Sequence, residues 1–125
     1  MNPETLARLK RASTATLTTQ MFKRGFRNVF IQGVRPLGRY GETMVGPAMT
    51  LRYIPAREDL DVLEGFADPE HPQRKAVETA PAGCVLVMDC RGETRVASGG
   101  SILMTRLWKR GVAGMVSDGG MRDAA

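Results

Sequence analysis

A continuous apolar run in the last third of the chain restricts its fold more than any other feature. Residues 84–89, CVLVMD, carry no polar side chain before the final aspartate, which is typical of a strand buried on both faces of a sheet. Residues 99–111, GGSILMTRLWKRG, follow with helical spacing, and residues 112–118, VAGMVSD, form a second apolar strand. This strand–helix–strand order over residues 84–117 predicts a βαβ-like unit and an α/β fold class.

The predicted helix has an inward face and a defined end. Ile102, Leu103 and Leu107 are expected to point toward the core, and Gly111 is expected to end the helix, because glycine accepts the backbone conformation found there.

The first third of the chain predicts two helices and a short strand. Residues 2–4, Asn-Pro-Glu, combine a capping side chain, a proline suited to the first turn and an acid at the positive helix end. Ser13 or Thr14 begins a second helix that stops at Gly25. Residues 28–33, NVFIQG, are predicted as a strand.

The middle of the chain is less regular. A glycine turn at residues 38–41 precedes a predicted strand over residues 43–53, in which Pro47 implies an edge position or a bulge. Residues 56–83 are polar and proline-containing, and predict one or two short helices. The acids of residues 57–64, REDLDVLE, are typical of a solvated helix face rather than of a metal site.

Composition indicates one globular domain over residues 1–125. The chain is 42% hydrophobic and 25% charged, and no apolar run approaches the roughly 18 residues that a membrane span requires. Cys84 and Cys90 are the only cysteines and match no zinc pattern, so we expect two reduced thiols in a cytoplasmic protein.

The net charge of +5 is unevenly distributed. Residues 1–39 hold eight basic residues and one acid, whereas residues 40–125 hold ten basic residues and twelve acids. A basic first third could contact RNA or an acidic patch on another subunit. Aromatic residues are only 6% of the chain and no RNA-stacking motif is present, so a nucleic-acid binder ranks below an enzyme.

Two loops after predicted strands could bind a ligand. The first is the helix start at Gly99, Gly100, Ser101, Ile102 and Leu103, where free backbone N–H groups and the helix dipole favour an anion. The same glycines would also be explained by close packing of the helix against a strand.

The second loop carries Arg122 and Asp123. An arginine binds a carboxylate through two parallel hydrogen bonds, and a single aspartate can anchor a Mg²⁺ ion that keeps most of its waters. An ordinary surface ion pair is the alternative. Together the two loops suit a small 2-oxo acid held beside one weakly bound metal ion.

These motifs resemble a known family. The glycine-rich helix start, RGVAG, and DGGMRD, together with GPAMT and STATLT, are similar to the family of regulator of ribonuclease activity A and 4-hydroxy-4-methyl-2-oxoglutarate/4-carboxy-4-hydroxy-2-oxoadipate aldolase. The resemblance implies a swivelling β/β/α domain in a trimer or a dimer of trimers, with sites between subunits. Family members include metal-dependent lyases and a non-catalytic regulator of ribonucleases.

The resemblance also implies roles for particular residues. Gly100, Ser101, Ile102 and Leu103 would form the substrate-binding stretch, with the amides of the last two facing the oxo acid. Arg122 would be the catalytic, substrate-binding arginine. Asp123 would be the ligand of a divalent metal, Mg²⁺ or Mn²⁺.

The sequence departs from the family's enzymes in two respects. Ser101 stands where those enzymes carry an Asp or Glu that helps to position a water molecule. The family also continues well past its Arg-Asp motif, whereas this sequence ends at Ala125, so we expect a C-terminally truncated domain.

Overall fold

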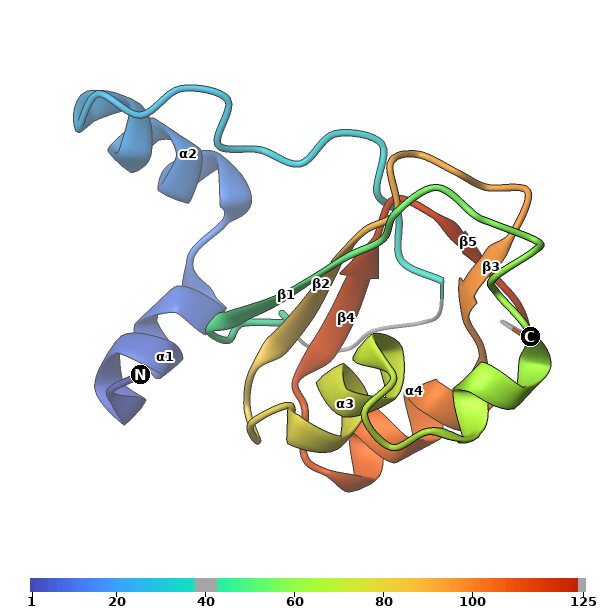
Figure 1. Ribbon diagram of the computed structural model, residues 1–125. Helices are drawn as coiled ribbons and strands as arrows, with labels where there is room; N and C mark the ends of the chain where they lie inside the picture. The colour runs from blue at the N-terminus through green and yellow to red at the C-terminus, as the bar shows by residue number, and fades with distance from the viewer. Residues whose placement is uncertain (38–42, 124–125) are drawn as a thin grey trace.

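A parallel three-stranded sheet, in the order β1-β2-β4, organises the chain (Figure 1). The computed structural model describes residues 1–37 and 43–123, and the glycine turn predicted at residues 38–41 lies outside them. The strands are β1 (Ala48–Arg52), β2 (Val85–Asp89) and β4 (Gly114–Ser117).

Strand β2 is the centre of this sheet. It pairs in parallel with β1 on one edge and with β4 on the other. Both apolar strands and the connecting helix predicted from the sequence are therefore confirmed, as is the α/β class. The second strand was expected to be buried, but β4 is only partly buried because it lies at an edge of the sheet. Strand β1 lies at an edge of the sheet, as predicted, but it begins at Ala48, after Pro47, and not at residue 43.

Two helices cover one face of the sheet and form the core with it. They are α3 (Pro72–Thr79) and α4 (Ser101–Lys109), which contribute Val77 and Leu107. Leu86 of β2, only 1% exposed, lies level with Met49 of β1 and Met115 of β4 in the strand register. The Leu86 side chain is therefore surrounded by residues of β1, β4 and the two helices.

The inward face of α4 differs from the prediction at one residue. Leu103 and Leu107 pack against the core and are joined there by Met104. Ile102 is 78% exposed, so its predicted inward position is wrong. The reason is geometric, since consecutive helix residues differ by about 100° and Ile102 cannot share the stripe defined by positions 103 and 107. Gly111 follows the helix with a positive φ of 76°, as its predicted stopping role requires.

A second, smaller pair of strands was not predicted. Strand β3 (Ala97–Gly99) pairs in parallel with β5 (Gly120–Met121). Their sequences, ASG and GM, are too short and too rich in small residues to produce a strand pattern.

The first 37 residues form an arm beside the sheet (Figure 1). Helix α1 (Pro3–Arg11) is capped by Asn2, and α2 (Thr14–Lys23) by Ser13, through side-chain oxygens that accept backbone N–H bonds of 2.8 and 3.1 Å. Neither helix has a buried residue. The strand predicted over residues 28–33 is wrong: this segment is irregular and pairs with no strand of the described chain.

The segment between β1 and α3 contains a short 3-10 helix, η1 (Leu63–Ala67). The acid-rich stretch before η1 is a turn and not the predicted helix face, because the Asp61 carboxylate accepts the backbone N–H of Arg57 at 2.6 Å and closes the loop. Within residues 1–37 and 43–123, no helix is long and apolar enough to cross a membrane.

The central position of Leu86 leads to a stability prediction. Leu86→Ala should lower the free energy of unfolding by about 2–5 kcal/mol, because it removes buried methyl groups and leaves a cavity. Urea denaturation followed by circular dichroism measures this loss. Ile54→Ala removes an aliphatic side chain that is 80% exposed and should change stability by less than about 0.5 kcal/mol. Equal effects of the two substitutions would show that β2 is not the core strand.

Candidate functional site

The candidate site lies where the β3–β5 pair ends. Gly100 follows β3 directly, and Arg122 follows β5 directly. Because the two strands are parallel, their carboxyl ends lie side by side, and this is where α/β proteins commonly bind ligands. The N–H of Arg122 donates to the carbonyl oxygen of Gly99 at 3.1 Å and ties the two loops together.

Gly100 lies against the side chains of both Arg122 and Asp123. A methyl group placed on its Cα would stand 2.9 Å from Cγ of Arg122 and 2.9 Å from Oδ2 of Asp123. The backbone of Gly100 is extended there (φ −155°), so the glycine is needed for this close approach and not for an unusual backbone conformation. The two loops that the sequence singles out are therefore adjacent.

The start of α4 provides free backbone donors. Gly100 is its N-cap, and no side chain of the described residues caps the helix. The first helical bond runs from the N–H of Met104 to the carbonyl oxygen of Gly100 at 3.0 Å, so the N–H groups of Ser101, Ile102 and Leu103 have no intrahelical acceptor. This end of the helix dipole favours a negative charge.

Arg122 and Asp123 make only a loose pair with each other. Nε of Arg122 lies 3.7 Å from Oδ2 of Asp123, and their side chains are 72% and 56% exposed. The Arg122 guanidinium group therefore makes no bidentate hydrogen bond to Asp123 and can bind a carboxylate of a ligand. Asp123 has a positive φ of 58°, which is uncommon for a residue with a side chain and turns the chain at this point.

The residues around Asp123 suit a hard, weakly held metal ion and no dense metal cluster. In the described parts of the chain, no group of three or more His, Cys, Asp or Glu residues is arranged to bind one. A single accessible carboxylate is what Mg²⁺ and similar ions use when water and substrate oxygens supply the other ligands. The oxygen donor of Asp123 thus fits the divalent ion that the family resemblance implies.

A polar network behind the site includes residues that the sequence did not indicate. Ser98, the residue before Gly99, is 6% exposed. Its carbonyl oxygen accepts bonds from the Tyr53 hydroxyl at 2.8 Å and from Nε2 of Gln73 at 2.7 Å. Its hydroxyl donates to the carbonyl oxygen of Gly120 at 3.0 Å. These bonds connect the residue after β1, helix α3 and strand β5 to Ser98, and burial raises the pKa of Tyr53.

Asp118 holds a second loop next to the site. Its carboxylate accepts the backbone N–H of Cys90 at 2.6 Å and that of Gly92 at 2.8 Å. These donors, Cys90 first, lower the pKa of Asp118 below its ordinary value of 3.8. An aspartate followed by two glycines at a strand exit is a sequence signal that could have identified this role.

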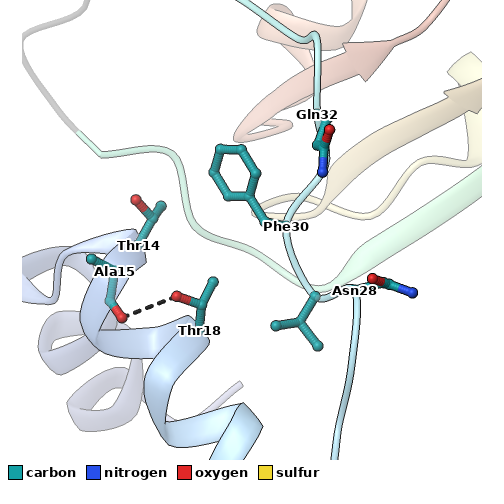
Figure 2. Close-up of a pocket in the computed structure, with 7 residues that line it drawn as sticks. Thr14, Ala15, Thr18, Asn28, Phe30 and Gln32 are labelled. Atoms are coloured by element: carbon teal, nitrogen blue, oxygen red, sulfur yellow. Dashed lines mark hydrogen bonds between the residues drawn. The ribbon is translucent and has the colours of Figure 1, made fainter.

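A separate hollow lies between α2 and the irregular segment that follows it (Figure 2). One wall is formed by Thr14, Ala15 and Thr18, where the Thr18 hydroxyl donates to the carbonyl oxygen of Ala15 at 3.0 Å. The other wall includes Phe30 and Gln32. None of its lining residues is ionisable, so this hollow offers no acid, base or metal ligand.

Gly100 provides a test of the site's geometry. Gly100→Ala should displace the Arg122 and Asp123 side chains while the domain stays folded, because the added methyl meets side-chain atoms and the backbone angles are permitted. Chemical shifts of the loop residues should change, with a fall in melting temperature of a few degrees at most. Gly65→Ala, where the methyl meets nothing within 4 Å, is the matched control. Unchanged chemical shifts around Arg122 would contradict the close approach.

Asp118 predicts a defined pH dependence of stability. Its pKa is lower in the folded state, so its stabilisation is present above the unfolded-state value near 3.8 and is lost as pH falls through the folded-state value. Urea unfolding at pH 6 and pH 3 should show a smaller pH effect in Asp118→Asn than in the wild type. Glu58→Gln, which removes an exposed acid elsewhere, is the control. A full wild-type pH effect in Asp118→Asn would rule out this carboxylate as the cause.

Comparisons with known proteins show which family this chain is similar to. A family model described as RraA-like, Aldolase/RraA, matches residues 14–125. The crystal structure of Streptomyces coelicolor RraAS2, described as an unusual member of the RNase ES inhibitor RraA protein family, is 30% identical with a TM-score of 0.80 and covers 99% of this chain and 57% of its own. An uncharacterised protein from Pseudomonas syringae pv. tomato, 21% identical, shares the fold with a TM-score of 0.69, covering 99% of this chain and 51% of its own.

A comparison with curated proteins gave no match. The chain spans just over half the length of the two solved relatives described above. The family model covers nearly all of the chain, and the match to the S. coelicolor relative covers 99% of this chain at 30% identity. The chain therefore belongs to the RraA-like family (Aldolase/RraA).

Proposed function

We propose that this chain carries the site of a divalent-metal-dependent lyase that forms pyruvate from small 2-oxo acids. The observation that supports this most directly is the packing of Gly100 against Arg122 and Asp123. It places a cation, a carboxylate and the free N–H groups at the start of α4 within one small region. That combination suits an acid with adjacent carboxylate and keto oxygens.

Arg122 and the helix start have complementary roles. The Arg122 fork would bind the substrate carboxylate through two hydrogen bonds. The N–H groups of Ile102 and Leu103 would hold the keto oxygen as negative charge develops on it. Donors fixed before the reaction stabilise such charge more effectively than water, which must reorient.

Asp123 would hold the divalent ion, Mg²⁺ or Mn²⁺. When bound, the ion supplies Lewis-acid polarisation of the substrate's oxygens. Because Asp123 is one exposed carboxylate, we expect weak affinity that depends on the substrate's own oxygens.

The bond changes would be those of oxaloacetate decarboxylation or of retro-aldol cleavage. In decarboxylation the C–C bond breaks, CO₂ leaves, and the electron pair forms a pyruvate enolate that is then protonated. Retro-aldol cleavage gives the same enolate but first requires a base to remove the substrate's hydroxyl proton. Ser101 can orient a water but accepts its proton poorly near neutral pH, so we propose that decarboxylation is the faster reaction.

The assembly and cell compartment belong to the same proposal. By family resemblance, we propose a homo-oligomer, a trimer or hexamer, with sites between subunits. Two free, buried thiols, Cys84 and Cys90, suit a reducing cytoplasm.

Substitutions at the two polar site residues test the activity. Pyruvate release from oxaloacetate should require Mg²⁺. Asp123→Asn should lose this Mg²⁺-dependent activity, which is most of the rate. Arg122→Lys keeps the charge but loses the fork, and should lower kcat/KM by at least about tenfold. Arg95→Lys, an exposed arginine paired with Glu93, is the control. Release from 4-hydroxy-2-oxo acids should be slower. Wild-type activity in both site variants would overturn the proposal.

A non-catalytic regulator of a ribonuclease is the alternative function. It is supported by the S. coelicolor relative, which is described within a family of RNase inhibitors. Under this alternative, purified protein would release no pyruvate with Mg²⁺ or Mn²⁺ and would slow RNA cleavage by a ribonuclease such as RNase ES. Slowed cleavage that persists in Asp123→Asn would favour regulation.

A further inference from the structure

Three side chains behind the candidate site form a continuous hydrogen-bonded series, which we call the thiol–hydroxyl chain. Sγ of Cys90 lies 3.3 Å from Oγ of Ser117, and that oxygen lies 3.2 Å from Oγ of Ser98. The Ser98 hydroxyl ends the series by donating to the carbonyl oxygen of Gly120 at 3.0 Å. Cys90 follows β2, Ser117 ends β4 and Ser98 lies in β3, so the series links the three-stranded sheet to the β3–β5 pair.

One arrangement of protons satisfies every bond of the thiol–hydroxyl chain. A carbonyl oxygen can only accept, so the single hydroxyl proton of Ser98 points to Gly120. Ser98 must then accept the proton of Ser117. Ser117 in turn accepts the thiol proton of Cys90 and, on its second lone pair, the backbone N–H of Gly119 at 3.0 Å. The direction of each bond therefore follows from the next, and the three side chains act as one unit.

The thiol–hydroxyl chain ends where the β3–β5 pairing is irregular. The pairing advances two residues along β3 but only one along β5, so Ser98 has no partner residue of its own. Such a bulge interrupts the regular backbone bonds, and bulges are frequent next to functional sites, where they redirect a side chain. The Ser98 hydroxyl provides a bond to Gly120 at this position. A side-chain hydrogen bond thus holds the bulge.

The bulge determines where Arg122 begins. Gly120 lies two residues before Arg122, and Gly99, which follows Ser98, accepts the Arg122 N–H at 3.1 Å. Gly120 is also tightly packed on its other side, because a methyl group on its Cα would stand 2.7 Å from backbone carbonyl oxygens of the loop over residues 94–96. The backbone that carries Arg122 is therefore fixed between this loop and the Ser98 hydroxyl.

We infer that Ser98 and Ser117 are positioning residues of the proposed site, with Cys90 as the first donor of their chain. They hold the Gly120 carbonyl group, and through it the segment that carries Arg122, without touching the substrate. Binding of a substrate carboxylate by Arg122 is part of the proposed function, on which this positioning role rests. The new element is that the accuracy of carboxylate binding depends on hydroxyl groups outside the two site loops.

Removal and retention of single hydroxyl groups test the positioning role. Ser98→Ala and Ser117→Ala each break the chain, and the double variant combines them. Ser117→Thr keeps the hydroxyl in a residue that suits a strand. Thr79→Ala removes an exposed hydroxyl that is bonded at 2.7 Å to a backbone carbonyl within α3, and is the matched control. All variants should fold, because the Ser98 carbonyl oxygen keeps its bonds from Tyr53 and Gln73.

The kinetic effect should appear in KM for oxaloacetate. Each alanine variant should raise KM about tenfold and change kcat by less than about twofold, because a misplaced Arg122 binds substrate and transition state equally less well. The double variant should match Ser98→Ala alone, since both substitutions break the same chain. Ser117→Thr and Thr79→Ala should keep the wild-type KM.

A measurement without turnover separates the positioning role from the lyase activity. The NMR chemical shift of the Arg122 backbone N–H should move in both alanine variants, and the affinity for oxalate, a small dicarboxylate probe, should fall about tenfold. An inactive wild type with this NMR pattern would overturn the lyase alone. Wild-type shifts and KM in both alanine variants would overturn the positioning role. So would effects that multiply in the double variant, or a Ser117→Thr variant that behaves like Ser117→Ala.

Discussion

The structure depends on the position of β2 between two parallel neighbours. Its backbone is hydrogen-bonded on both edges, and Leu86 and Met88 face the helices on one side. A shift of one residue in register would turn these side chains to the opposite face and lose the core. The register with β1 and β4 is therefore set by packing, and it determines where α4 and the loops that flank it are placed.

The candidate site takes its rigidity from this sheet. The β3–β5 pair has three and two residues, which is too short to be stable alone. Ser98 of β3 is hydrogen-bonded to Tyr53, which follows β1, and to Gln73 of α3. Asp118, in the turn between β4 and β5, is hydrogen-bonded to the backbone of Cys90 at the end of β2. The arrangement of Gly100 beside Arg122 therefore rests on a few partly buried hydrogen bonds rather than on the short strands themselves.

The predictability of each element follows from its physical cause. The strands around residues 84–89 and 112–118 were predicted because burial requires long apolar runs, and α4 because its apolar residues repeat at helical spacing. The strand expected at residues 28–33 fails because β-propensity is realised only against a partner strand, and this segment pairs with none in the described chain. Strands β3 and β5 form through tertiary pairing alone. The site residues that directly follow strands could be identified from the sequence. The role of Ser98 could not, because it depends on hydrogen bonds to residues 25 and 45 positions away in the sequence.

The parallel pairing of β2 also sets the order in which the sheet can be completed during synthesis. Val85 aligns with Ala48, made 37 residues earlier, and with Gly114, made 29 residues later. At 5–20 residues per second, a ribosome needs about 1.5–6 s to make those 29 residues. Throughout that interval an apolar strand has one open edge, the kind of surface that recruits chaperones or another nascent chain. The length of that interval follows the speed of translation, so slower synthesis leaves the open edge of β2 unpaired for longer.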